Sequence, residues 1–180
     1  GCQVDLFLTV QPEQLQGEAM AAFQRLPQCL RQTLRQQLTA GDLDWNTLVI
    51  DGLLGTGVKG IPREPIASWI ELVNASGCPV LAIDLPSGLN ADNGAAELAI
   101  TADMTVTFAA IKAGMLLQRG PECCGRLEVA DIGIPDHYLQ NPTKCIEVFS
   151  QADARQILHR ENFSTYKNQR GHVGIIGGSS

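Results

Sequence analysis

The chain has 180 residues, of which 44% are hydrophobic, and its 19 acidic and 13 basic residues give a formal net charge of -6 at pH 7. This apolar content is enough for a buried core and excludes a chain that is disordered throughout. The acidic balance argues against a surface that binds nucleic acid by charge, and no apolar run reaches the roughly 18 residues that a membrane-spanning helix needs.

Short apolar segments alternate along the chain with segments of helical periodicity. Helical spacing predicts helices within 12–38, where Pro27 divides the segment in two, and within 65–74. Strands are predicted at 4–10, 47–50, 79–83, 105–110, 126–132 and 173–176. Strands that are apolar on both faces and separated by helices indicate an α/β fold, with a Rossmann-like, mostly parallel sheet and helices on both faces.

Charged side chains follow three of these predicted strands. Asp51, Asp84 and Lys112 each stand at or just past a strand's carboxyl end, which is where open α/β sheets bind their ligands. Two unpaired carboxylates at an apolar sheet edge would be costly, so we expect Asp51 and Asp84 to lie together in a functional site. Lys112 fits either an anionic ligand at this edge or an ordinary solvated surface.

The segment from Asp51 to Gly60 reads DGLLGTGVKG. Its glycines allow a ligand to approach the backbone closely. Gly55, Gly57 and Gly60 also match the G-x-G-x-x-G dinucleotide fingerprint, with Asp84 near the position of a ribose-binding acid. Two prolines delay the following helix, so that match is imperfect. A glycine-rich connection without a ligand remains a third interpretation.

The segment from Asp84 to Asn90 reads DLPSGLN. A carboxylate at a strand end and the Ser87 hydroxyl three residues later suit a small hard cation or a sugar hydroxyl. Capping of the following turn is the alternative interpretation. The presence of Asp51 at a neighbouring strand end favours the functional one.

The six cysteines form no C-x-x-C pair, and the sequence shows no signal peptide. We therefore expect reduced thiols in a cytoplasmic protein. Because the chain begins at Gly1 and ends in a glycine-rich run, we expect it to be an excerpt of a longer polypeptide.

Four motifs in one order resemble the NAD(P)H-hydrate epimerase family, also called the YjeF N-terminal domain. They are DGLLGTG at 51–57, DLPSGL at 84–89, TVTF at 105–108 followed by Lys112-x-Gly114, and DIGIP at 131–135. The resemblance covers about residues 1–135. Residues 166–179 resemble the opening of the partner dehydratase domain, which has a ribokinase-like fold. The implied division is an epimerase domain at 1–149, lacking its first part, and at 150–180 a linker with the first strand of a truncated dehydratase domain.

The resemblance implies a bifunctional enzyme of nicotinamide-nucleotide repair. Its epimerase interconverts the R and S forms of hydrated NADH or NADPH. The dehydratase, which uses ADP or ATP with Mg²⁺ and acts on the S form, can then restore the reduced cofactor. In the family, the residues matching Asp51 and Ser87 hold a potassium ion, and Asp84 contacts the substrate, where we expect it to be catalytic. The segment that would line the substrate comprises Gly55, Thr56, Gly57, Val58, Lys59, Gly60 and Ile61. The family's N-N-G-G-D loop is absent from this sequence.

The expected partner is therefore a small-molecule substrate, not nucleic acid or a membrane, and homo-oligomer formation is left open. Two other functions also remain open. One is an NAD-dependent dehydrogenase that binds its cofactor through Gly55, Gly57 and Gly60, and the other is a non-catalytic ligand-binding module.

Overall fold

The computed structural model describes residues 3–57, 60–139 and 148–157. The chain divides into two compact units, 1–141 and 142–180. The first unit contains the whole described sheet, and the described part of the second contains helix α6 (Gln151–Ile157). Within the described ranges, none of the helices is both long enough and apolar enough to cross a membrane.

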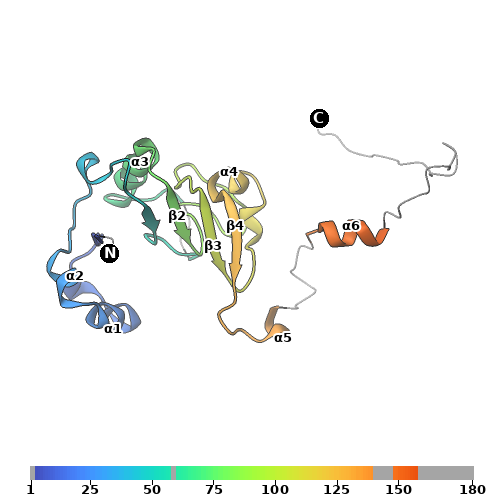
Figure 1. The fold of residues 1–180 in the computed structure, drawn as a ribbon, viewed down its shortest axis with the longest axis horizontal. Coiled ribbons are helices and arrows are strands. Elements are labelled where there is room, and N and C mark those ends of the chain that lie inside the picture. The colour runs from blue at the N-terminus through green and yellow to red at the C-terminus, as the bar shows by residue number, and fades with distance from the viewer. Residues whose placement is uncertain (1–2, 58–59, 140–147, 158–180) are drawn as a thin grey trace, which may run out of the picture. The chain divides into compact units, whose positions relative to one another are not determined.

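A four-stranded parallel sheet forms the centre of the first unit (Figure 1). Its strands lie in the order β1-β2-β3-β4, the order of the sequence, and every neighbouring pair is parallel. The strands are β1 (Val49–Asp51), β2 (Val80–Ile83), β3 (Met104–Phe108) and β4 (Arg126–Ala130). This sheet confirms the predicted α/β, Rossmann-like fold.

The helices of the first unit are mostly short. Pro27 separates the first two, as predicted, because it lacks the backbone N–H that a continuing helix needs. The elements are η1 (Pro12–Gln14), α1 (Gly17–Arg25), α2 (Gln28–Gln32), η2 (Ala40–Asp42), α3 (Ile66–Ser76), η3 (Ala113–Met115), α4 (Gly120–Cys124) and α5 (Asp136–Leu139), where η marks a 3₁₀ helix. The predicted helix at 65–74 is confirmed as α3.

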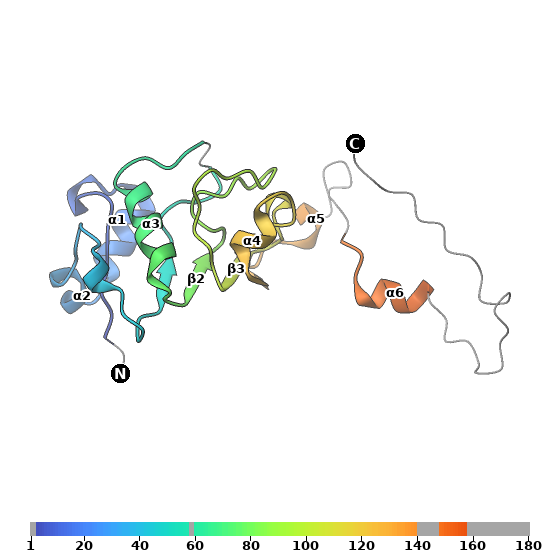
Figure 2. The same ribbon diagram turned by 90° about the horizontal axis from the view of Figure 1, so that it is seen from above.

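The buried core lies on one face of the sheet. α3 lies beside β2, and α4 lies beside β3 and β4 (Figures 1 and 2). Ile70 and Val73 of α3 pack against Val80 and Ala82 of β2. The Thr105 hydroxyl of β3 donates to a backbone carbonyl of α4 at 2.8 Å. These contacts hold β2 and β3, the strands that lead into the predicted site, in place.

The predicted strand at 4–10 is wrong. The segment makes only an isolated parallel bridge, between Phe7 and Arg35. The bridge consists of Arg35 N–H donating to Leu6 at 2.9 Å and Leu8 N–H donating to Arg35 at 3.0 Å. The predicted strand at 173–176 lies outside the described residues.

Candidate functional site

The residues predicted from the strand ends do come together at one edge of the sheet. Asp51 is the last residue of β1 and pairs in register with Ala82 of β2, two residues before Asp84. Lys112 follows β3 by four residues, at the start of η3. Parallel strands end at the same edge, so the loops that carry these side chains are neighbours (Figure 1).

Asp51 and Ser87 form a buried hydrogen-bonded pair. Their exposed fractions are 3% and 1%. The Ser87 hydroxyl donates to Oδ1 of Asp51 at 2.6 Å, and the Ser87 backbone N–H donates to Oδ2 at 2.7 Å. Leu53 N–H also donates to Oδ1, at 3.2 Å, and the Ser87 hydroxyl accepts from Leu54 N–H at 2.9 Å. The pair therefore joins the loop after β1 to the loop after β2.

Burial raises the pKa of Asp51, although hydrogen bonds from Ser87 and Leu53 offset part of the effect. Among the described residues, no ion pair includes this carboxylate. A buried carboxylate without a cationic partner is costly, and a bound cation would relieve that cost. Carboxylate and hydroxyl oxygens are ligands that hard cations prefer, so Asp51 and Ser87 fit the potassium ion that the resemblance implies.

The described residues offer no group of three or more His, Cys, Asp or Glu side chains that could hold a metal ion. A cation at Asp51 would therefore take its remaining ligands from hydroxyl, carbonyl or water oxygens.

Asp84 has a different set of partners. Its Oδ1 forms an ion pair with the Lys112 ammonium and also accepts from Phe108 N–H at 3.0 Å and the Thr107 hydroxyl at 3.3 Å. Its Oδ2 accepts none of the hydrogen bonds that the described residues make. Asp84 also has a left-handed backbone, with φ of 68°, a conformation that Asp tolerates better than most residues.

Partial burial raises the pKa of Asp84, but the hydrogen bond and charge of Lys112, together with the donors at Phe108 and Thr107, outweigh it. The pKa lies below its ordinary value as a result. Asp84 is therefore a carboxylate at neutral pH, with Oδ1 held by three donors and Oδ2 without a hydrogen bond from the described residues. Such a group can accept a proton or orient a water molecule.

The described residues of the glycine-rich segment that would line the substrate are exposed to solvent. Gly55, Thr56, Gly57, Gly60 and Ile61 are all exposed, whereas Val58 and Lys59 lie outside the described residues. A Cβ at Gly55 or Gly57 would meet nothing within 4 Å, and neither residue has a positive φ. The fold itself does not require glycine at these two positions, which is the pattern expected where a ligand approaches the backbone.

Two other motif glycines are required by the fold. Gly88 has φ of 94°, and a Cβ there would lie 2.2 Å from the Leu98 carbonyl oxygen. A Cβ at Gly114 would lie 2.0 Å from the Asn90 carbonyl oxygen. These glycines allow the loop after β2 to pack against the residues that follow β3.

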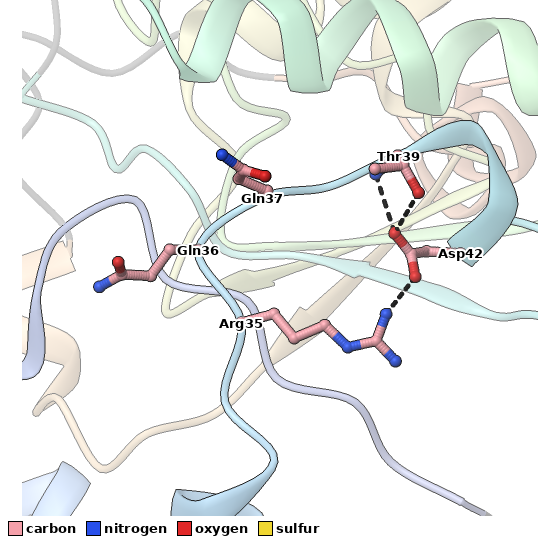
Figure 3. Close-up of a pocket in the computed structure, with 5 residues that line it drawn as sticks. All are labelled: Arg35, Gln36, Gln37, Thr39 and Asp42. Atoms are coloured by element: carbon pink, nitrogen blue, oxygen red, sulfur yellow. Dashed lines mark hydrogen bonds and ion pairs between the residues drawn. The ribbon is translucent and has the colours of Figure 1, made fainter.

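Pockets on the described part of the chain include one near the predicted site and one away from it. One, of about 110 Å³, is lined by Gly60 of the glycine-rich segment and by five residues of the loop after β2, namely Gly88, Asn90, Ala95, Ala96 and Glu97. The other, of about 470 Å³, includes none of the predicted site residues (Figure 3). Its Asp42 accepts from Thr39 N–H at 2.9 Å and the Thr39 hydroxyl at 2.7 Å, and pairs with Arg35. These contacts cap η2, so the polar side chains of this second pocket have a structural role.

Sequence reasoning identified Lys112 as a charged residue at a strand end but did not connect it with Asp84. It also missed Thr107, which lies on the buried face of β3 and contacts both residues. The available signal was a threonine near the end of an apolar strand, five residues before a lysine.

Comparisons with known proteins agree on one family. The family model described as YjeF-related protein N-terminus matches residues 1–114. Relatives named bifunctional NAD(P)H-hydrate repair enzyme Nnr include that of Moorella thermoacetica, 36% identical over 99% of this chain and 35% of the relative. The enzyme of Salinibacter ruber is 33% identical over 99% of this chain and 36% of the relative. That of Escherichia coli is 37% identical over 73% and 25%, respectively. The chain spans about a third of the length of the first two relatives.

The buried pair yields a prediction about stability. All three groups that contact the Asp51 carboxylate are hydrogen-bond donors. Asp51→Asn puts an NH₂ group against a buried donor and should lower the free energy of unfolding by about 1–3 kcal/mol. Urea denaturation of the purified protein measures the change.

Asp92→Asn is the matched control, because Asp92 is exposed and its carboxylate accepts none of the hydrogen bonds recorded among the described residues. We expect a change within about 0.5 kcal/mol there. An Asp51→Asn variant as stable as the wild type would show that the buried charge, rather than the three hydrogen bonds, dominates the energetics of this pair.

Proposed function

Because the chain belongs to the YjeF-related protein N-terminus family, we propose that it interconverts the R and S forms of hydrated NADH and NADPH. The relatives that it matches are named NAD(P)H-hydrate repair enzymes, and epimerisation is the step of that repair that we assign to this unit. The observation that carries the proposal is the ionised Asp84 carboxylate. Its Oδ2 accepts no hydrogen bond from the described residues, and the carboxylate lies at the same sheet edge as the exposed glycine-rich segment.

Epimerisation requires the carbon–oxygen bond of the hydrate to break and to form again on the opposite face of the ring. The departing hydroxyl takes up one proton and leaves as water, and the returning water gives up one proton. An ionised Asp84 can accept that proton or orient the water, and a positioned proton transfer of this kind contributes roughly 10²–10⁴-fold to a rate.

Asp51 and Ser87 would hold the potassium ion. The ion would supply positive charge to a buried carboxylate and stabilise the arrangement of the two loops that the pair joins. The substrate would lie along Gly55, Thr56, Gly57, Gly60 and Ile61, with Val58 and Lys59 completing the segment.

We further propose that residues 1–149 form the epimerase domain and residues 150–180 a linker and the first strand of a dehydratase domain that uses ADP or ATP with Mg²⁺. Support comes from relatives with the word bifunctional in their names that align over 99% of this chain. The motif at 166–179 lies outside the described residues. Cys78, Cys123 and Cys124 are buried free thiols, which fits the reducing cytoplasm that the sequence predicts.

The dehydrogenase alternative has less support. The dinucleotide fingerprint requires its glycines to lead directly into a helix. Here α3 begins only at Ile66, six residues after Gly60. Asp84, the candidate ribose-binding acid, has one oxygen occupied by Lys112 and its neighbours.

The direct test is to incubate the purified protein with R-hydrate and to follow S-hydrate by chromatography. The wild type should form S-hydrate with no net oxidation or reduction, and Asp84→Asn should abolish this reaction. A circular-dichroism spectrum and a urea midpoint equal to those of the wild type are the control for folding. A wild type that forms no S-hydrate would refute the proposed function, and an active Asp84→Asn would remove Asp84 from the mechanism.

A second experiment tests the cation. Asp51→Ala removes the charged ligand, so the epimerase rate should lose its dependence on added potassium while a lower basal rate remains. Asp92→Ala, which removes an exposed carboxylate, should titrate like the wild type. A potassium titration of Asp51→Ala that matches the wild-type curve would contradict the assignment.

A third experiment separates ligand contact from fold in the glycine-rich segment. Gly57→Ala places a methyl group in open space, so stability should change little while KM for the hydrate rises about tenfold, or about 1.4 kcal/mol. Gly52→Ala is the matched control, because its Cβ also meets nothing within 4 Å and we do not expect it to line the substrate. An unchanged KM for Gly57→Ala would exclude Gly57 from the substrate site.

A further inference from the structure

We propose that Lys112 is a positioning residue: its ammonium fixes Oδ1 of Asp84, so that Oδ2 alone serves the substrate. The inference rests on the proposed function. It assigns a role to a side chain that the sequence left as either a ligand for an anion or a solvated surface lysine.

The contacts of Lys112 exclude direct binding of an anion in this arrangement. A lysine ammonium has three N–H donors. Here its partners are Oδ1 of Asp84, the Thr107 hydroxyl oxygen at 2.8 Å and the Phe108 carbonyl oxygen at 3.0 Å. Each donor therefore has an acceptor from the protein, and the side chain is only 21% exposed. Lys112 acts on the site through Asp84 instead.

The fold holds Lys112 in this place from both sides. The chain leaves β3 through Ala109, whose left-handed φ of 63° turns it off the sheet. Beyond Lys112, Gly114 N–H donates to the Ala91 carbonyl at 2.7 Å, and the absence of a Cβ at Gly114 allows the loop after β2 to approach. Lys112 therefore stands two residues before Gly114, whose backbone is hydrogen-bonded to the loop after β2.

The three donors that meet at Oδ1 of Asp84 come from one segment of chain, residues 107–112. Thr107 and Phe108 contribute dipoles, and Lys112 contributes the only titratable contact of Asp84 among the described residues. Its loss would leave Asp84 with weaker donors and a carboxylate that is free to turn. The pKa of Asp84, now held below its ordinary value mainly by Lys112, would rise toward that value.

The test compares Lys112→Met, Lys112→Arg and wild type on R-hydrate. Lys112→Met should lower kcat about 100-fold and change KM less than twofold, because substrate contacts stay in place. The acidic limb of its pH profile should move to higher pH. Lys112→Arg keeps the charge, so its acidic limb should stay near the wild-type position. Its kcat should be intermediate, because a guanidinium cannot reproduce the three contacts.

Arg35→Met is the matched control, because it breaks an ion pair with Asp42 that includes none of the site residues. Its kcat and pH profile should equal those of the wild type. A merely structural ion pair at Lys112 would make Lys112→Met behave like Arg35→Met, and that result would overturn the inference.

The outcomes separate the two proposals. An active wild type with an unchanged kcat and acidic limb in Lys112→Met refutes the positioning role and leaves the epimerase function standing. An inactive wild type refutes the epimerase function, and the positioning role with it. If Lys112→Met does not fold, Lys112→Arg decides: a wild-type kcat there overturns the inference, and an intermediate kcat with an unmoved acidic limb supports it.

Discussion

The hydrogen bonds between Asp51 and Ser87 hold the carboxyl edge of this sheet together. They connect two loops that are 36 residues apart in sequence, and both partners are almost wholly buried. A lost partner would leave a buried donor or charge unsatisfied, which costs more than an exposed hydrogen bond contributes. The positions of the glycine-rich segment and of the loop that carries Asp84 therefore depend on one another.

Two carboxylates at this edge have pKa values shifted in opposite directions. Burial raises the pKa of Asp51, while Lys112 and its neighbours bring the pKa of Asp84 below its ordinary value. Two aspartates are thus suited to different roles. Asp51 can gain a bound cation, whereas Asp84 already pairs with the Lys112 ammonium. A difference in environment of this kind is how a site divides binding from proton transfer.

The sequence was most informative where a local pattern decides the structure. Apolar runs identified the four described strands, and the rule for strand ends placed Asp51 and Asp84 at one edge. The sequence was least informative where contacts between distant segments decide the structure. The segment at 4–10 resembles a strand but has a single bridge to Arg35. Between β3 and Lys112, which contacts Asp84, the chain passes through a left-handed Ala109, and no sequence pattern indicates that conformation.

A resemblance to a family identifies motif residues but does not say which of them act on the ligand. In this chain, Gly88 and Gly114 are glycines because a Cβ would collide with backbone oxygens, whereas Gly55 and Gly57 meet no such obstacle. The first two therefore shape the loops, and the second two keep a surface open. The same separation applies to charge: all three donors of Lys112 bind acceptors of the protein, while Oδ2 of Asp84 accepts no hydrogen bond from the described residues. In the function proposed above, the substrate would meet the Oδ2 atom of Asp84 and the exposed backbone of the glycine-rich segment.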